Sequence, residues 1–388
     1  MLQPSPSDPT DVEVAYFKSS SVQWAGINAD PGVRMWVSAR ERAELGVRKG
    51  DLLVCEGGDV GRCAIYDGPE GFIFQNSIHR VRGREGSDVR YFRYVMEALH
   101  GSSWLDVLCN KATIRHLTAD KLGMLEIPHP EGVVQRQIAD YLDAEVQRID
   151  TVVRKRAEQS YLLQLRRAAA LAKEFDQAAS SEPTRLKYLM RNKPRYGVLV
   201  PEFVDDGVPF VRVNDLLDLQ GRSATLVRIP ETLSRQYART RIQPNDILLS
   251  VVGTLGRAAL VPAELEGANV ARAVASLRVR HDVDPGLFVR WIETADFMRQ
   301  AVDATGGDTA QPTLGMEDLA NFKLRWPTEA DEQRRLAQVV EEVAKHHDEL
   351  AACYQKQTRL LAELRRTLIT AAVTGQLDVT TARGVRVP

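Results

Sequence analysis

The chain has 388 residues, of which 44% are hydrophobic and 27% charged, and its 51 basic and 52 acidic side chains leave a formal charge of −1. This composition is typical of a globular protein with two or three cores, and it excludes collagen-like and wholly disordered chains. The sequence has no run of about 18 apolar residues, no basic start followed by an apolar stretch, and no paired cysteine motif, so we expect a cytoplasmic chain with no membrane span.

The chain contains an internal sequence repeat, in which one unit occurs twice. Residues 50–65 (GDLLVCEGGDVGRCAI) align without gaps on residues 245–260 (NDILLSVVGTLGRAAL), at an offset of 195. Three further blocks follow the same order, namely YFKSSSV on FVRVNDL, LGMLEIPHP on LANFKLRWP, and QRQIADYL on QRRLAQVV, and the offsets stay between 194 and 198. Four collinear matches predict a duplicated unit of about 195 residues.

Each copy has two parts of different character. Short β-branched runs broken by glycine, proline and asparagine predict a mixed, strand-rich domain. The segment that follows is rich in Ala, Leu, Gln, Glu and Arg and predicts a long helix. We therefore expect an α+β fold with these parts in chain order: a first domain over 1–130, a helix over 131–177, a second domain over 184–327, a helix over 328–375 and a tail over 376–388.

The lead-in to the second domain is longer than the lead-in to the first. About 25 residues precede Phe210 in the second copy, whereas about 15, rich in proline, serine and aspartate, precede Tyr16 in the first. We therefore expect the first domain to have the less complete start.

The second helix carries a heptad pattern. Its apolar positions alternate at spacings of three and four residues, which is typical of a coiled coil. The first helix keeps the pattern less well, because Arg156, Gln159 and Arg166 fall on it. Helices of this length need a packing partner in water, so we expect the two to pair antiparallel. The expected seam is Leu142, Ile149, Val152 and Leu163 in the first helix and Val340, Val343, Leu350, Leu361, Leu364 and Leu368 in the second.

The sequence has no recognisable catalytic motif. It lacks a GxxxxGK[ST] phosphate loop, a GxGxxG loop and the [ND]PP[YF] motif of amino-methyltransferases. Cys55 and Cys63 flank the first glycine-rich stretch, but Ser250 and Ala258 replace them in the second copy, so we expect buried structural thiols. We therefore expect a binding protein that is not an enzyme and holds no metal or cofactor of its own.

The glycine-rich stretches at 57–61 and 253–256 allow two interpretations. They are either tight turns between strands, or turns that bring the backbone and the following Arg62 or Arg257 to a phosphate or a base edge. The distribution of charge along the chain helps to choose between these two interpretations. Residues 14–115 carry 14 basic and 12 acidic side chains, residues 184–280 carry 15 and 9, and the remainder carries 22 and 31. Both strand-rich domains are thus positive, as DNA-binding surfaces are.

The duplication, the two helix starts PHPEGVVQRQIADYLDAEVQRID and PTEADEQRRLAQVVEEVAKHHDEL, and the closing LRRTLITAAVTGQLDV together resemble the DNA-specificity subunit of type I restriction-modification systems. DTAQPTL, ahead of the second helix, is similar to that family's Gly/Gln-rich stretch. The resemblance implies two target-recognition domains that read a bipartite, asymmetric site on double-stranded DNA, and a helix pair that fixes the gap between the half-sites.

The resemblance also implies partner proteins. These are two methyltransferase (modification) subunits and two restriction/translocase subunits, and S-adenosylmethionine, ATP and Mg are expected on them rather than on this chain. The alternative is a duplicated coiled-coil scaffold that joins other proteins without binding DNA. The concentration of positive charge in the two strand-rich domains favours the first interpretation.

The candidate DNA contacts are polar residues that recur in both copies. Arginine, asparagine and glutamine are the side chains that read guanine and adenine edges with two hydrogen bonds, although each residue alone can equally be an ordinary surface residue. The candidates follow the first strand, follow the glycine turn, occupy matched positions on a later strand, and precede the long helix. They are Lys18, Ser20, Arg62, Arg80, Arg82, Lys111 and Thr113 in the first copy and Arg212, Asn214, Arg257, Arg278, Arg280, Gln311 and Thr313 in the second.

Overall fold

The structure, a computed structural model, describes residues 3–28, 30–102, 104–109, 116–178, 182–306 and 311–380. The chain forms two compact units: unit 1 is Met1–Arg156 with Lys356–Pro388, and unit 2 is Ala157–Gln355. The division falls inside the two long helices, whereas the sequence placed it at their starts. Each unit therefore holds a globular part together with a portion of each long helix.

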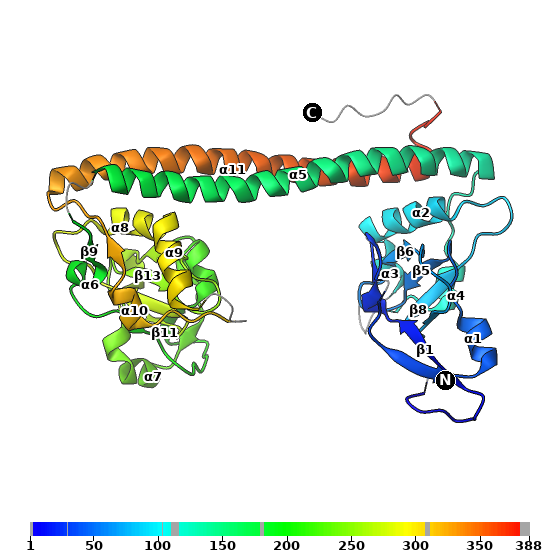
Figure 1. Ribbon diagram of the computed structural model, residues 1–388, viewed down its shortest axis with the longest axis horizontal. Coiled ribbons are helices and arrows are strands. Elements are labelled where there is room, and N and C mark those ends of the chain that lie inside the picture. The colour runs from blue at the N-terminus through cyan, green and yellow to red at the C-terminus, as the bar shows by residue number, and fades with distance from the viewer. Residues whose placement is uncertain are drawn as a thin grey trace. The chain divides into compact units, whose positions relative to one another are not determined.

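Unit 1 begins with short strands and ends on long helices (Figure 1). Its strands are β1 (Val12–Phe17), β2 (Val22–Gln23), β3 (Gly26–Ile27), β4 (Arg34–Val37), β5 (Leu52–Cys55), β6 (Cys63–Ile65), β7 (Ile73–Phe74) and β8 (Ile78–Val81). Its helices are η1 (Ser19–Ser21), α1 (Ala39–Leu45), α2 (Val89–Gly101), α3 (Trp104–Leu108), α4 (Ala119–Gly123), the start of α5 (Gly132–Ala178) and the end of α11 (Ala330–Val373).

Unit 2 has the same kind of content. Its strands are β9 (Thr184–Arg185), β10 (Arg195–Tyr196), β11 (Val208–Val211), β12 (Arg228–Ile229), β13 (Ile247–Ser250), β14 (Ala258–Leu260), β15 (Asn269–Val270), β16 (Val274–Leu277) and β17 (Lys323–Leu324). Its helices, besides the remaining parts of α5 and α11, are α6 (Leu186–Leu189), η2 (Val213–Leu217), η3 (Ser223–Thr225), α7 (Glu231–Gln236), η4 (Ala238–Thr240), η5 (Ala263–Leu265), α8 (Pro285–Ile292), α9 (Ala295–Ala304) and α10 (Met316–Ala320).

Two three-stranded arrangements recur in both units. In unit 1, β1 pairs antiparallel with β4 and parallel with β7, and in unit 2, β11 pairs antiparallel with β12 and parallel with β15. The second sheet has the order β6-β5-β8 in unit 1 and β14-β13-β16 in unit 2, where β10 adds a fourth strand beside β16. The residues of β5 and β13 are buried along their whole length, as the central strands of such sheets are. The duplication read from the sequence is therefore a duplication of fold.

The extra strand β10 lies within the longer lead-in of the second copy. Its Arg195 and Tyr196 pair with Ser276 and Ala275 of β16. Within the described part of unit 1, β8 has only β5 beside it. This difference agrees with the shorter lead-in of the first copy.

The long helices pack onto the globular part of each unit. In unit 1, Leu142 and Ile149 of α5 share a buried cluster with Leu361 and Leu368 of α11 and with Tyr91 of α2. In unit 2, a corresponding cluster joins α5 and α11 to α8 and to the central sheet, with Leu171, Phe175, Leu336, Val340 and Phe288 among its members. Both helices thus share a core with each domain.

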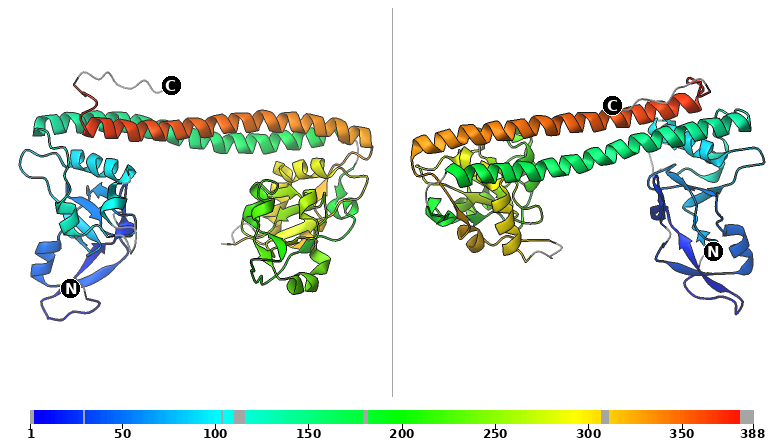
Figure 2. Two further views of the ribbon diagram at one scale, coloured as in Figure 1. Left: turned by 180° about the vertical axis from the view of Figure 1, so that it is seen from behind. Right: turned by 45° about the horizontal axis from the view of Figure 1, so that its top comes forward.

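The two helices run in opposite directions within each unit, side by side in both views of Figure 2. In unit 1, Asp150 Oδ1 accepts from Arg365 Nε at 3.0 Å, and in unit 2, Arg167 Nε lies 3.0 Å from Asp348 Oδ1. As α5 advances by 17 residues between these two ion pairs, α11 steps back by 17. The expected α+β fold, with a duplicated mixed domain and an antiparallel helix pair, is confirmed.

The expected seam is buried at the two ends of the pair and weaker between them. Its members Leu142, Ile149, Val340, Leu361 and Leu368 are buried, and Val152, Leu163, Val343 and Leu364 are half-buried. The expectation was wrong for Leu350, which is 37% exposed. The reason is that apolar contact concentrates where a globular part also covers the helices, while polar residues such as Arg156 and Gln159 occupy the stretch between.

A buried glutamine ties the start of each long helix to its globular part. Gln135 Oε1 accepts from the Asp88 amide at 3.0 Å, and Gln333 Oε1 accepts from the Asp284 amide at 2.8 Å. Asp88 and Asp284 are themselves the N-caps of α2 and α8. Because both glutamines are almost fully buried, these hydrogen bonds fix the angle at which each domain meets its helix. The repeated Gln-x-x-Ile/Leu-Ala pattern thus attaches the start of each long helix to its globular part.

No helix within the described part of the chain is long and apolar enough to cross a membrane.

Candidate functional site

A glycine turn joins two strands of the central sheet at the same place in both units. It runs from Glu56 to Arg62 between β5 and β6, and from Val251 to Arg257 between β13 and β14. Gly58 and Gly61 have φ values of 75° and 83°, and the matching Gly253 and Gly256 have 72° and 79°. Side chains rarely adopt this left-handed backbone, which explains the glycines. The stretches are tight turns between strands, which both interpretations require.

Replacement of Gly256 is expected to destabilise unit 2 more than replacement of Gly253. Alanine at either position costs about 1–2 kcal/mol because the backbone is left-handed. A Cβ on Gly253 would meet no atom within 4 Å, but a Cβ on Gly256 would lie 2.5 Å from Met298 Sδ. This contact adds about 1 kcal/mol, the lower end of the overpacking range, because the flexible methionine side chain can shift. Urea unfolding of Gly256→Ala and its control Gly253→Ala measures the difference, and equal losses would contradict the packing.

The arginine after each glycine turn braces a second loop. Arg62 Nη2 donates to the Ser19 carbonyl at 2.9 Å, and Arg257 Nη1 donates to the Val213 carbonyl at 3.3 Å. These carbonyls belong to η1 and η2, the turns that follow β1 and β11. Arg62 also pairs with Asp59 at 3.3 Å and its side chain is 17% exposed. Both expected DNA-contacting arginines therefore hold two loops together.

A third segment closes onto the same end of the strands. In unit 1, the Leu117 amide donates to the Glu56 carbonyl at 2.8 Å, and in unit 2, the Gly253 amide donates to the Pro312 carbonyl at 2.9 Å. The turn after the first strand, the glycine turn and the segment before the long helix thus meet in each unit. We call this surface the Gly-turn face. It comprises Lys18, Ser20 and Glu56–Arg62 in unit 1 and Arg212, Asn214, Val251–Arg257, Gln311 and Thr313 in unit 2.

Several of the expected contacts are accessible on this face. Ser20, Arg212, Asn214, Gln311 and Thr313 are exposed, and Lys18 is half-buried. Arg212 Nε also lies 3.3 Å from the buried Asp215 carboxylate, and this ion pair holds the Arg212 side chain in place. The expected contacts Lys111 and Thr113 lie outside the described residues.

Arg82 and Arg278 lie at the opposite end of the strands from the Gly-turn face. Arg82 forms two hydrogen bonds with the carboxylate of Asp51, at 2.6 and 2.9 Å, and Arg278 forms two with Asp246, at 2.6 and 2.7 Å. Both carboxylates are buried, and their hydrogen bonds raise the pKa of each arginine. These arginines therefore support the start of β5 and of β13.

The expected match of Arg80 and Arg82 with Arg278 and Arg280 was wrong. Strand register pairs Leu53 with Arg80 and the matching Leu248 with Ser276, so Arg80 corresponds to Ser276 and Arg82 to Arg278. Burial, and then the neighbouring Arg82, lower the pKa of Arg80. Arg280 lies past the strand and pairs with Asp282. The expected match has an offset of 198, which needs three more residues in the second copy after its glycine turn, whereas the strand register has an offset of 196 and so only one more.

A ring of ionisable side chains surrounds the unit 1 turn, and no motif in the sequence predicted it. His100 Nε2 lies 2.7 Å from Asp59 Oδ1, and Glu56 lies 3.7 Å from both His79 and His116. Val251 and Thr254 take the places of Glu56 and Asp59 in unit 2. The Gly-turn faces therefore share a backbone and differ in chemistry. A local motif search misses this ring because its histidines lie 17 or more residues along the chain from the turn.

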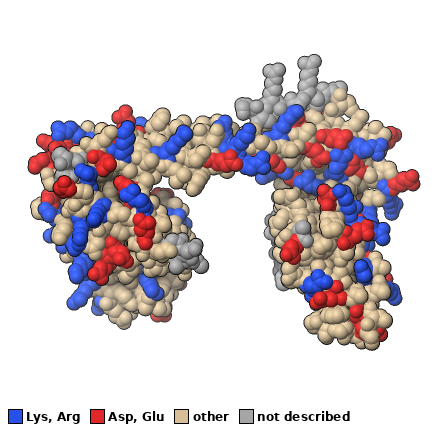
Figure 3. All heavy atoms as spheres, viewed as in Figure 1, with Lys and Arg blue, Asp and Glu red and all other residues tan. Residues whose placement is uncertain are grey.

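The cysteines beside the unit 1 turn are buried, as expected. Burial raises the pKa of both the Cys55 and the Cys63 thiol, so both remain protonated near neutral pH. Across the described ranges, no group of three or more histidine, cysteine or carboxylate side chains is placed to hold a metal ion. Basic and acidic side chains are interspersed on the visible face of each unit (Figure 3).

Comparison with known proteins shows what this chain is similar to. Residues 41–158 match the type I restriction modification DNA specificity domain. The specificity subunit of the type I restriction enzyme EcoBI from Escherichia coli is 23% identical over 354 residues, which covers 84% of this chain and 73% of that protein. A chain in a solved structure described as the basis of complex assembly and conformational transition of the type I R-M system has the same fold, with a TM-score of 0.66 and 16% identity over 97% of this chain and 95% of that one.

The domain match, the relative and the shared fold agree with the duplicated architecture and its two long helices. Residues 41–158 thus match a type I restriction modification DNA specificity domain, and most of the chain is similar in sequence to a type I specificity subunit.

Proposed function

We propose that this chain recognises a bipartite, asymmetric DNA site, and that each unit reads one half-site with its Gly-turn face. The main support is that both units close the same three loops onto the same strand ends. An arginine brace of the same kind, Arg62 to Ser19 and Arg257 to Val213, holds them. Rigid support under exposed polar side chains is what base recognition requires.

The two half-sites are expected to differ. Lys18 and Ser20 of unit 1 correspond to Arg212 and Asn214 of unit 2. Arginine favours guanine and asparagine favours adenine in the major groove, because each donates or accepts at two atoms of the base edge. Side chains, not backbone, distinguish base pairs, so two faces with one backbone and different side chains suit a non-palindromic site.

The helix pair sets the number of unread base pairs between the half-sites in this proposal. The chain also recruits two methyltransferase subunits that carry S-adenosylmethionine, and two restriction/translocase subunits that use ATP and Mg. Adenine methylation by those subunits requires the base to leave the duplex. This chain's part is to choose where on the DNA that happens.

Duplex binding by the reconstituted complex with the modification partner tests this function. We expect the affinity for the target duplex to exceed that for a scrambled duplex by a factor of about 1,000 or more at physiological salt. Affinity for both should fall as salt rises. Equal affinities would contradict sequence recognition. Stable assembly with the partner but no binding to either duplex would favour the scaffold alternative.

A further inference from the structure

A basic pocket opens in unit 2 at the end of the strands opposite the Gly-turn face. It is formed by the lead-in around Asn192–Arg195, the segment 238–243, the turn at 266–267 and β16, and its volume is about 440 Å³. Lys193, Arg195, Arg239, Arg241 and Arg278 contribute five cations to its lining, whereas Glu266 is the one acidic residue among the lining residues. We call it the Arg195 pocket.

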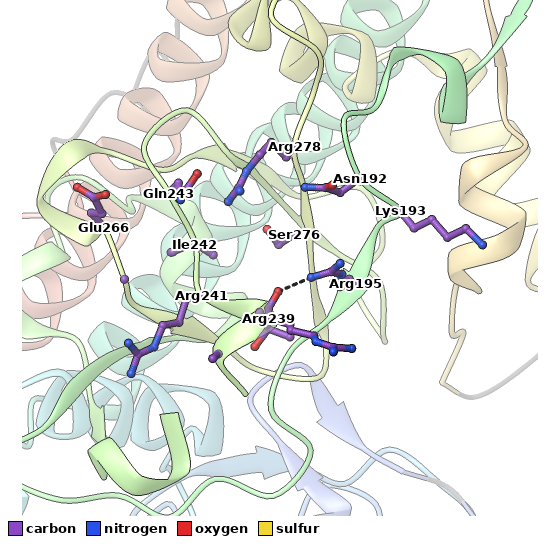
Figure 4. Close-up of a pocket in the computed structure, with 13 residues that line it drawn as sticks. Asn192, Lys193, Arg195, Arg239, Arg241, Ile242, Gln243, Glu266, Ser276 and Arg278 are labelled. Carbon is purple, nitrogen blue, oxygen red and sulfur yellow. Dashed lines mark hydrogen bonds between the residues drawn. The ribbon is translucent and has the colours of Figure 1, made fainter. Parts of the chain in front are cut away.

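Four polar side chains surround its middle. Figure 4 shows Arg278 and Asn192 on one side and Arg195 on the other, with Ser276 between them, while Lys193 and Arg241 extend away from the middle. Arg195 Nη1 donates to the Arg239 carbonyl at 2.8 Å, the contact drawn there as a dashed line. Arg241 is occupied elsewhere, on Glu231 and Ser234.

These groups are held in place and still have donors to spare. Arg278 uses Nε and Nη2 on the buried Asp246, which leaves Nη1 without a partner among the described residues. Asn192 and Ser276 likewise have no side-chain hydrogen bond within the described part of the chain. Arginines fixed by a buried carboxylate or a carbonyl lose little conformational freedom when they bind an anion, which favours binding.

We propose that the Arg195 pocket binds a phosphate group, with Arg195 and Arg278 as charged donors and Asn192 and Ser276 as neutral donors. Guanidinium groups match the geometry of phosphate oxygens, and the volume accommodates a phosphodiester or a diphosphate. The phosphate comes either from the backbone of bound DNA or from a free diphosphate. The assignment of the phosphate to bound DNA rests on the proposed function, whereas the proposal that the pocket binds a phosphate group does not.

Among the described residues, the site is found in unit 2 alone. Unit 1 has no counterpart of β10 in its described residues, so the donors of Asn192–Arg195 have no equivalent there. Arg80 takes the place of Ser276 and donates to the Gly46 carbonyl. A phosphate bound in the Arg195 pocket would therefore anchor only one side of a bipartite site.

Two variants and one control test the proposal. Arg195→Gln removes a charged donor, and Lys193→Glu reverses the charge at the rim on an exposed side chain without hydrogen bonds to the described residues, so it leaves folding intact. The control, Arg335→Gln, changes the same charge on an exposed residue of α11. Circular dichroism of each variant checks its fold. Inorganic pyrophosphate is titrated into the full chain by calorimetry, and the target duplex is bound by the reconstituted complex at several salt concentrations.

Two results support the pocket. In the first, Arg195→Gln weakens pyrophosphate binding at least tenfold while Arg335→Gln does not, and the ligand is then a free diphosphate. In the second, pyrophosphate does not bind, and both pocket variants lower the salt slope of duplex binding by about one phosphate contact. The ligand is then the DNA backbone. If neither variant alters pyrophosphate binding or the salt slope of duplex binding, the proposal that the Arg195 pocket binds phosphate is wrong. If duplex binding then still discriminates the target from a scrambled sequence, the proposed function stands. If the chain without substitutions does not discriminate the target from a scrambled sequence, the proposed function is contradicted instead.

Discussion

Insertion of seven residues into each long helix, after Arg156 in α5 and after Gln355 in α11, is expected to abolish methylation at the natural half-site spacing. Seven residues keep the heptad phase and lengthen each helix by about 10 Å. This length corresponds to about three base pairs of duplex, because successive pairs are about 3.4 Å apart. Half-sites at the natural spacing then no longer meet both Gly-turn faces. Sequencing of methylated genomic DNA measures the loss.

The control for this insertion carries seven extra residues after Thr380, beyond α11. It should methylate as the unmodified chain does, because the helix pair is unchanged. Circular dichroism and assembly with the modification partner confirm that the lengthened helices still pair. Unaltered methylation at the natural spacing by the lengthened chain would reject the role of the helices in setting the gap.

Replacement of Asp246 by alanine is expected to cost unit 2 about 3 kcal/mol of unfolding free energy. Its carboxylate is 2% exposed, accepts two hydrogen bonds from Arg278, and also accepts the Gln243 amide at 2.8 Å. Its removal leaves a guanidinium and a backbone donor without their partner. The loss stays at the lower end of the range for buried pairs because Arg278 is 27% exposed and regains some hydration. Urea unfolding measures it.

A second substitution separates the ion pair from simple loss of packing. The double variant Asp246→Ala/Arg278→Met removes the unpaired charge and should recover part of the stability. Asp246→Asn keeps an acceptor for the Gln243 amide and should lose less than Asp246→Ala. Additive effects of the two single substitutions would show that the pair makes no net contribution.

The parts of the fold that depend on local pattern were predictable from the sequence. The glycine turns recur with the same spacing because the same left-handed backbone recurs at Gly58 and Gly253. The long helices were recognisable because nothing in 133–177 or 330–373 interrupts a helix. The pairing of the helices followed from seam residues such as Leu142 and Leu368, which have few other ways to leave water.

Features that depend on contacts between distant residues were not predictable. Arg62 and Arg257 looked like free basic residues, but each donates to a carbonyl more than 40 positions away. Strand register matches Arg278 with Arg82, because the second copy has one additional residue after its glycine turn and not the three that a match with Arg80 needs. The Arg195 pocket was not predicted because its lining comes from four segments and because β10 has no counterpart among the described strands of unit 1 that would mark it as repeated.

The central claim is that each unit reads its own half-site, and methylome sequencing of a host that expresses this chain with its methyltransferase partner tests it most directly. We expect one bipartite motif with two different halves and a fixed gap. The variant Arg212→Ala/Asn214→Ala should relax one half and leave the other half and the gap unchanged, since both residues lie on the Gly-turn face of unit 2. A single continuous motif, or a change in both halves on this substitution, would contradict the account.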